Sequence, residues 1–303
     1  MFPIIPANSA TVSGNTEGIF GFGESAGGKV GMTNLVSNAG VVASDVAAVG
    51  TGRYTLAACE YGEDKGIFGY GVNGGDPGTA VTNLVSNAGV VTSDVAGVGT
   101  GRYWPAACSY GGDKGIFGYG HDGNATAITN LVSNAGVVTS DVAGVGTARY
   151  SLTACEYGED KGIFGFGNDG SKAGMTNLVS NAGVVADDVS AVGTGRTGPA
   201  ACGYGGDKGI FGFGDTGSPG GYTGATNLVT NAGVVGSDVA GVGTARNAPA
   251  ATQYGGNKGI FGYGHDGSNR VSITNLVTSA GVVGSDVAGV GTDRNSLAAC
   301  SFN

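Results

Sequence analysis

Apolar residues recur along this chain in short runs separated by glycine, and no stretch keeps the 3.6-residue apolar period of a helix. The clearest run, Gly-Ile-Phe-Gly-Tyr/Phe-Gly, occurs six times at steps of 48, 49, 47, 47 and 50 residues. Its isoleucines are Ile19, Ile67, Ile116, Ile163, Ile210 and Ile260. A Thr-Asn-Leu-Val phrase keeps the same spacing, starting at Thr33, Thr82, Thr129, Thr176, Thr226 and Thr274. So does a Gly-Thr-x-Arg phrase, ending at Arg53, Arg102, Arg149, Arg196, Arg246 and Arg294. This self-similarity predicts an all-β repeat protein.

The second copy shows what each repeat should contain. A tight turn at Gly62 to Lys65 separates the first two strands, and a Gly- and Asp-rich loop at Val72 to Thr79 follows the second. The expected strands are Ala57 to Tyr61, Ile67 to Tyr70, Val81 to Val91 and Asp94 to Thr100. Four strands per repeat suit either the blades of a propeller or the coils of a solenoid. The tight turn indicates antiparallel neighbours, which favours blades.

The order of these motifs resembles a Kelch-type repeat over residues 17 to 303. The Ile-Phe-Gly-Tyr-Gly segment stands where that family has an aromatic strand ending in two glycines. Two departures are that Gly-Tyr-Gly or Gly-Phe-Gly replaces the double glycine, and that Trp104 is the sole tryptophan. The resemblance implies a six-bladed β-propeller of about 48-residue, four-stranded Kelch-like repeats. The repeat motifs are also similar to those of repeat arrays in virion and tail-associated proteins of tailed bacteriophages. This resemblance implies a virion protein made in the host cytoplasm.

We therefore expect a single β-propeller domain over residues 1–303. Its repeats are approximately 10–53, 54–102, 103–149, 150–196, 197–246 and 247–294, with a closing strand at 297–302. That last segment has the pattern of a first strand with no second strand behind it, so it should complete the blade begun near Glu17 and remove two open edges. The alternative is that the N-terminal segment Ser9 to Val12 closes the ring.

Composition limits the function. Glycine supplies 64 residues and proline only 7, and regularly placed Val, Ile, Leu and Phe argue against a disordered or collagen-like chain. The net charge of −9, with 14 Lys and Arg spread singly, is not typical of nucleic-acid binding. No run of about 18 apolar residues predicts a membrane span, and the first residues lack the pattern of a signal peptide. We expect no nucleic acid, no membrane insertion and, failing a virion, a cytoplasmic location.

Five cysteines occupy one register of the repeat, each ending a small-residue step. They are Cys59, Cys108, Cys155, Cys202 and Cys300, and the remaining positions of that register are Thr11 and Thr252. A position that accepts either Cys or Thr suggests a small buried side chain and not a crosslink. The sequence therefore predicts free thiols in a reducing compartment.

Variation among the six copies is confined to two kinds of segment, the loop after the second strand and the link from one repeat to the next. In a four-stranded meander both emerge on one face. We interpret this variable face as a recognition surface for a glycan or a protein, because binding groups commonly lie on loops of a rigid scaffold. The alternative is that exposed loops drift while packed turns cannot. The candidate ligand-binding residues are Tyr54, Tyr103, Trp104, His121, Asp122, Tyr150, Tyr222, His265 and Asp266. For Tyr103 and Trp104, packing between blades is the competing interpretation.

Catalytic signals are weak. His121 and His265 are the two histidines, and in a six-bladed ring they fall on opposite blades, so they should not share a metal ion. The aspartates that occur once per repeat should be structural, as should the recurring Arg and Lys that pair with them or with carbonyl groups. Those aspartates are Asp45, Asp94, Asp141, Asp188, Asp238 and Asp286. We expect no catalytic residues, no metal and no cofactor. We therefore expect a non-catalytic structural or recognition module, with other virion proteins among its partners. The alternatives are a pure scaffold and a carbohydrate-active enzyme.

Overall fold

The structure is a computed structural model that describes residues 15–74, 78–217 and 221–303, and these parts contain strands and no helix. Accordingly, no helix that could cross a membrane occurs among them. Six three-stranded antiparallel sheets follow the six repeats, and we number them sheet 1 to sheet 6. Ser9 to Val12, Thr11 and parts of two variable loops lie outside the described residues.

Each sheet has an inner, a middle and an outer strand. The inner strands are β21 (Ala298–Phe302) in sheet 1, then β5 (Ala57–Tyr61), β8 (Ala106–Tyr110), β11 (Thr153–Tyr157), β14 (Ala200–Tyr204) and β17 (Ala250–Tyr254). The middle strands are β1 (Glu17–Gly21), β6 (Lys65–Gly69), β9 (Lys114–His121), β12 (Lys161–Asn168), β15 (Lys208–Gly212) and β18 (Lys258–Gly262). The outer strands are β4 (Thr33–Val36), β7 (Thr82–Val85), β10 (Ala125–Val132), β13 (Lys172–Val179), β16 (Thr226–Val229) and β19 (Thr274–Val277). A small extra sheet joins β2 (Glu24–Ser25), β3 (Gly28–Lys29) and β20 (Arg294–Asn295).

The register is the same in every repeat. In sheet 2, Ile67 of the middle strand lies opposite Cys59 of the inner strand and Leu84 of the outer strand. In four sheets the middle strand ends just before an aromatic residue with a left-handed backbone, such as Tyr70 with φ 68°, whereas β9 and β12 continue past the equivalent residue with a shift in register. An aromatic residue is rare in that conformation. It recurs at all six equivalent positions, where the ring is wholly buried, so tertiary packing holds it.

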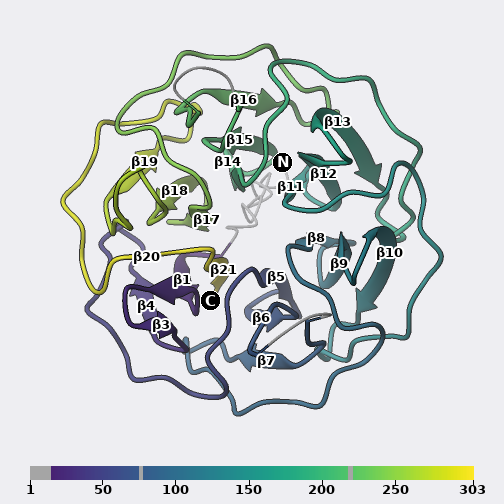
Figure 1. The fold of residues 1–303 in the computed structure, drawn as a ribbon, viewed down its shortest axis with the longest axis horizontal. Coiled ribbons are helices and arrows are strands. Elements are labelled where there is room, and N and C mark those ends of the chain that lie inside the picture. Colours follow the sequence, from purple (N-terminus) through teal and green to yellow (C-terminus); the bar gives the residue numbers. More distant parts are fainter. Residues whose placement is uncertain (1–14, 75–77, 218–220) are drawn as a thin grey trace, which may run out of the picture.

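The six sheets stand around a central axis with their inner strands nearest to it (Figure 1). Each inner strand contacts the next one, and β21 at the C-terminus contacts both β17 and β5. β21 also pairs antiparallel with β1, with Phe302 opposite Glu17 and Ala298 opposite Gly21. The prediction that the C-terminal strand completes the first sheet is therefore confirmed.

Backbone hydrogen bonds link the sheets at both ends of the inner strands. At one end, six link residues bond to one another in a closed cycle in which each N–H donates to the preceding carbonyl over 2.8–3.1 Å. Its members are Thr55, Trp104, Ser151, Gly198, Ala248 and Ser296. At the other end, each tight turn donates to the next, as Gly62 does to the Asp113 carbonyl at 2.7 Å, and Asn303 returns to the Asp64 carbonyl. The chain thus makes two unbroken circuits of main-chain bonds around the axis.

Glycines of the middle strands let neighbouring sheets approach closely. A Cβ on Gly115 would lie 2.5 Å from Cys59 Sγ of the preceding sheet, and a Cβ on Gly118 would lie 2.7 Å from the Phe164 ring of the next. The same contacts recur around the ring, with Thr252 in place of a cysteine against Gly18. All five cysteines are free and buried, which confirms that part of the prediction.

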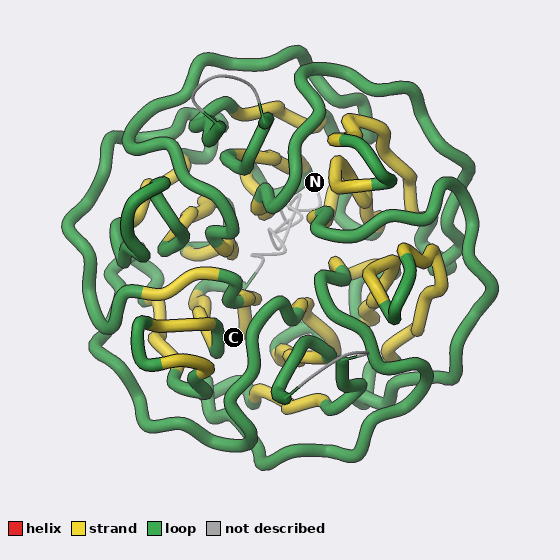
Figure 2. The backbone as a smooth tube through the Cα atoms, in the orientation of Figure 1, coloured by secondary structure: helices red, strands yellow, loops and turns green. Residues whose placement is uncertain are grey.

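The predicted fourth strand, Asp94 to Thr100, is wrong: the sheets have three strands, and the segment outside β7 makes only isolated bridges at Val91 and Val95. The predicted third strand, Val81 to Val91, is shorter because a turn follows Val85, closed by the bond from Ser86 N–H to the Val90 carbonyl. Such irregular segments form the outermost layer of the molecule (Figure 2). Side-chain hydrogen bonds, together with isolated backbone bonds such as those between Thr82 and Val95, hold them there in place of a strand ladder.

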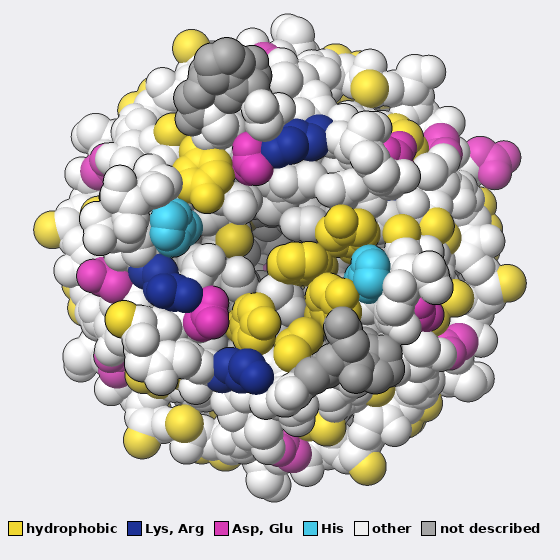
Figure 3. All heavy atoms as spheres, in the orientation of Figure 1, with side chains coloured by type: hydrophobic (Ala, Val, Ile, Leu, Met, Phe, Trp, Pro, Cys, Tyr) yellow, Lys and Arg dark blue, Asp and Glu magenta, His cyan; other side chains and the backbone are white. Residues whose placement is uncertain are grey.

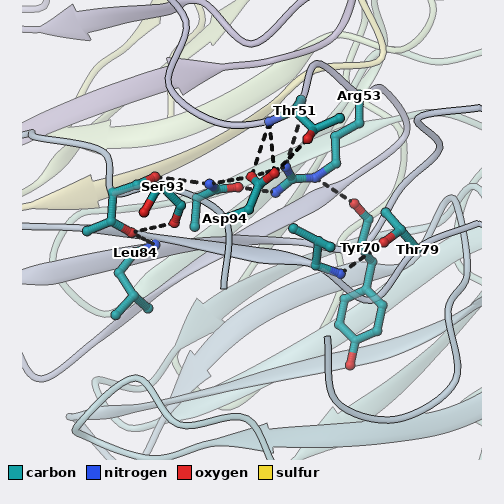
Figure 4. Close-up of polar contacts among 10 residues, drawn as sticks. Thr51, Arg53, Tyr70, Thr79, Leu84, Ser93 and Asp94 are labelled. Atoms are coloured by element: carbon teal, nitrogen blue, oxygen red, sulfur yellow. Dashed lines mark hydrogen bonds and ion pairs between the residues drawn. The ribbon is translucent and has the colours of Figure 1, made fainter. Parts of the chain in front are cut away.

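The recurring arginine and aspartate organise that layer, as the sequence predicted (Figure 4). Arg53 is fully buried, donates from Nε to the Tyr70 carbonyl (2.9 Å) and from Nη2 to Asn83 Oδ1 (2.6 Å), and lies 4.3 Å from the centre of the Phe22 ring in the preceding sheet. Asp94 accepts from Asn83 Nδ2 at 2.9 Å and from Thr51 Oγ1 at 2.6 Å. The arginine therefore joins two sheets, and the aspartate ties the outer segment to the link.

Candidate functional site

The variable loops and the links lie on one face, as predicted. In five repeats a link residue forms a bridge with a residue at the end of the middle strand or just beyond it. These bridges are Tyr54 with Val72, Tyr103 with His121, Tyr150 with Asn168, Thr197 with Asp215, and Asn247 with His265. We call this surface the variable face; Figure 3 looks onto it and shows hydrophobic side chains gathered beside a central hollow.

Four of the candidate residues form one aromatic cluster on this face. The Trp104 ring stacks on the Tyr150 ring, with centroids 5.5 Å apart and planes at 16°. His121 lies between Tyr103 (4.9 Å) and Tyr150 (5.1 Å), and Tyr103 meets Trp104 edge to face at 5.3 Å. The cluster spans sheets 3 and 4. Trp104 thus packs across a repeat boundary, as the competing interpretation expected, yet it remains 36% exposed.

The backbone of Trp104 is unusual for so large a residue. Its φ is 50°, in the left-handed region, because it belongs to the closed cycle of link residues. The other five members of that cycle are Thr, Ser, Gly, Ala and Ser, all small. A bulky side chain at positive φ costs of order 1 kcal/mol, and such strain concentrates at functional sites. This position therefore carries an exposed indole where the fold itself requires only a small residue.

Inside the cycle lies a small cavity on the central axis, which we call the axial socket. It has a volume of about 70 Å³. Its upper tier consists of the six cycle residues, Trp104 among them. Its lower tier consists of the residues that follow them, Leu56, Pro105, Leu152, Pro199, Pro249 and Leu297. The socket was not predicted from the sequence, although a Leu or Pro precedes every inner strand.

The remaining candidates are not among the clustered rings, although Asp122 follows His121 directly in the chain. Tyr222 and His265 meet edge to face at 6.1 Å in sheets 5 and 6, and Tyr54 has Lys29 Nζ 5.8 Å from its ring centre. Asp122 Oδ1 accepts from the Asn124 N–H, and Asp266 Oδ1 accepts from the N–H groups of Ser268 and Asn269.

These backbone bonds hold the pKa of Asp266 below its usual value, as expected for a carboxylate that caps its own loop. The two aspartates therefore shape loops, and their bonds within the loop leave less capacity for a ligand.

The histidines take a similar local role. His121 Nδ1 accepts from the Gly123 N–H at 3.2 Å, and His265 Nδ1 accepts from the Gly267 N–H at 3.1 Å. They belong to sheets 3 and 6, as predicted. Within the described ranges, no group of three or more His, Cys, Asp or Glu side chains is placed to hold a metal ion.

Two carboxyl groups lie deeper on the axis, toward the face opposite the variable one. Glu60 and Glu156 project from inner strands β5 and β11 and line the same axial cavity as Ser109 and Gln253. Ser109 Oγ donates to Glu156, and Ser301 Oγ donates to Glu60. Burial, and then the charge of Glu60, raise the pKa of Glu156 to about 8. Neither glutamate was a candidate from sequence, because four of the six repeats have other residues at this position.

Comparison with known proteins adds no relative: no protein-family model matches the chain, and no curated protein sequence is similar to it. The site must therefore be interpreted from its own geometry.

Proposed function

We propose that the chain is a six-bladed β-propeller of Kelch-like repeats, each blade being one three-stranded sheet with its irregular outer segment. The two circuits of backbone hydrogen bonds support this proposal, as does the pairing of β21 with β1. Closure of this kind removes open inner edges that would otherwise pair with other chains. A solenoid would leave its first and last units without such bonds.

We propose further that the propeller is a recognition module whose variable face binds a glycan or a protein. The observation that carries this proposal is Trp104: the other five repeats have a small residue there, yet here an exposed indole stands at a left-handed backbone position and is stacked on Tyr150. Aromatic faces beside hydrogen-bonding groups suit sugars, whose C–H surfaces pack on rings. Rigid aromatic side chains are also enriched where proteins bind proteins.

We propose that the chain is a virion or tail-associated protein of a tailed bacteriophage. This proposal rests only on the similarity of the repeat motifs. In such a setting the variable face would contact a host glycan or another virion protein. A pure scaffold role is the outcome that the experiment below must separate from recognition.

Binding of the intact protein to a glycan array, and to candidate virion proteins immobilised one by one, tests the recognition function. We expect binding that Trp104→Ala reduces at least about tenfold. Lys65→Ala is the control, because Lys65 is half-exposed at the start of β6, beside the tight turn on the other face, and its loss should leave binding unchanged. Absence of any ligand whose binding depends on Trp104 would favour the scaffold.

A further inference from the structure

The axial socket presents two chemically distinct tiers. In the upper tier, every main-chain N–H and C=O of the cycle is already bonded to a neighbour in the cycle, so the main chain there offers few groups to a ligand. The side-chain hydrogen-bonding groups at this level are the hydroxyls of Ser151 and Ser296 and the indole N–H of Trp104, since the Thr55 hydroxyl donates to the Tyr54 carbonyl. The lower tier is aliphatic, and proline supplies three of its six residues without any N–H. A guest must therefore be polar at the rim and apolar at its inner end.

The size of the socket limits the guest further. At about 70 Å³, it has room for ~5 heavy atoms, given the 10–15 Å³ that a single buried water requires, and a further axial cavity of about 100 Å³ shares its Leu and Pro residues and continues inward along the inner strands. A substituent of about that size, carried by a sugar ring, fits the socket itself. Trp104 lines the same socket and is exposed beside it, so the ring that carries the substituent can rest against the indole.

We propose that the axial socket holds the acetamido group of an N-acetylated sugar, with the methyl group in the Leu/Pro tier, the amide at the level of Ser151 and Ser296, and the sugar ring against Trp104. This rests on the proposed recognition function and specifies its ligand class. Apolar contact with the methyl group and hydrogen bonds to the amide act together, so a free amine or a plain hydroxyl at the same carbon binds worse. An ammonium group would enter an aliphatic pocket without a counter-charge.

Three oligosaccharides that differ only in the substituent on the carbon that bears the acetamido group provide the test. They are a β-1,4 trimer of N-acetylglucosamine, its deacetylated glucosamine form and the glucose trimer. Trp104 is the sole tryptophan, so its fluorescence reports occupancy of the site directly. We expect the acetylated trimer to shift the emission and to bind at least about tenfold more tightly than the other two. Equal affinities for the three trimers would overturn the inference while leaving recognition intact.

Ala248→Leu fills the socket from the repeat opposite Trp104, at a cycle position where Trp104 shows that a large side chain is compatible with the fold. This variant should lose the preference for the acetylated trimer. The control is Ala39→Leu on an exposed turn, which should keep it, and thermal unfolding of both variants checks folding.

Undiminished preference in Ala248→Leu would contradict the inference. If none of the trimers binds while another ligand still requires Trp104 on the array, the acetamido assignment fails and the recognition function survives. If nothing binds in a Trp104-dependent way, both fail.

Discussion

Thr292 donates from its hydroxyl to Asp45 Oδ2 at 2.7 Å, although 247 residues separate the two in the chain. The Thr292 N–H bonds to the same carboxylate, and Asp45 also accepts from Asn34 Nδ2 at 2.9 Å. In the other repeats the equivalent bond joins sheets that are consecutive in sequence, as Thr100 and Asp141 do. The same local arrangement therefore joins neighbouring sheets in every repeat, and at Asp45 it also joins the first sheet to a segment near the end of the chain.

Asp45→Ala and Asp141→Ala should lower the free energy of unfolding by similar amounts, about 1–2 kcal/mol, because each removes the same charge-assisted bonds. Their local effects should differ. Asp45→Ala weakens the junction between sheets 6 and 1, so amide exchange in β21 should accelerate, while Asp141→Ala should leave β21 protected. Hydrogen-exchange mass spectrometry makes the comparison, and equal protection of β21 in both variants would contradict it.

Arg102 should be among the most sensitive positions in the protein. It is fully buried, donates to the Tyr119 carbonyl and to Asn130 Oδ1, and lies 4.1 Å from the centre of the Tyr70 ring. Arg102→Met leaves two buried acceptors unsatisfied, so we expect a loss of about 3 kcal/mol by urea unfolding.

Lys114→Ala is the control for this prediction, because its ion pair with Asp113 is partly exposed and in the same repeat. The expected loss there is below about 1 kcal/mol. Similar losses of unfolding free energy in the Arg102 and Lys114 variants would contradict the view that the buried arginine holds neighbouring sheets together.

Gly115 and Cys59 should be energetically coupled. Gly115→Ala places a methyl group where Cys59 Sγ lies, which should cost about 1–3 kcal/mol. Cys59→Ala makes room for that methyl group, so the double variant should be more stable than the sum of the single changes predicts. A double-mutant cycle by chemical denaturation measures the coupling, and strict additivity would show that the two residues do not share the space.

Glu156 predicts a pH dependence of stability with a definite sign. Its pKa is raised from 4.5 to about 8 in the folded state, so the folded protein holds a proton that the unfolded chain releases. The stabilising contribution is fully present below pH 4.5 and is lost as the pH rises toward 8. Glu156→Gln should therefore be more stable than the wild type at pH 9, by about 1–3 kcal/mol, and equal to it near pH 4. Thermal unfolding across this range tests the prediction, and a constant difference between the two proteins would exclude it.

The inner and middle strands could be predicted from the sequence because the same motif occurs in every repeat. The inner and middle strands follow from a tight turn between two apolar runs, and the partner for β1 follows from the unpaired pattern at Leu297 to Phe302. The fourth strand failed for a physical reason. Val95 and Val98 have the composition of a strand, but they are 45% and 39% exposed, and side-chain bonds to Asp94 hold the segment in place of a ladder.

The candidate site was predictable only in part. The recurrence of variable links and loops placed Tyr103, Trp104, His121 and Tyr150 on one face, and the structure brings these four together. The sequence could not show that Tyr54 lies outside this cluster, because cluster membership depends on which side chains meet across a repeat boundary. The left-handed backbone of Trp104 depends on the hydrogen-bonded cycle, which no single repeat encodes.

The two circuits of main-chain bonds also change what a terminal unit means in this molecule. Linear repeat arrays need specialised polar units at each end to cover exposed apolar faces. Here the sheet of β1 and the sheet of β18 cover each other, and the two ends of the chain lie side by side within sheet 1, where β21 pairs with β1. Chains rearranged to start at Tyr103 or Tyr150, with the present ends joined by a linker, should consequently reach the same ring.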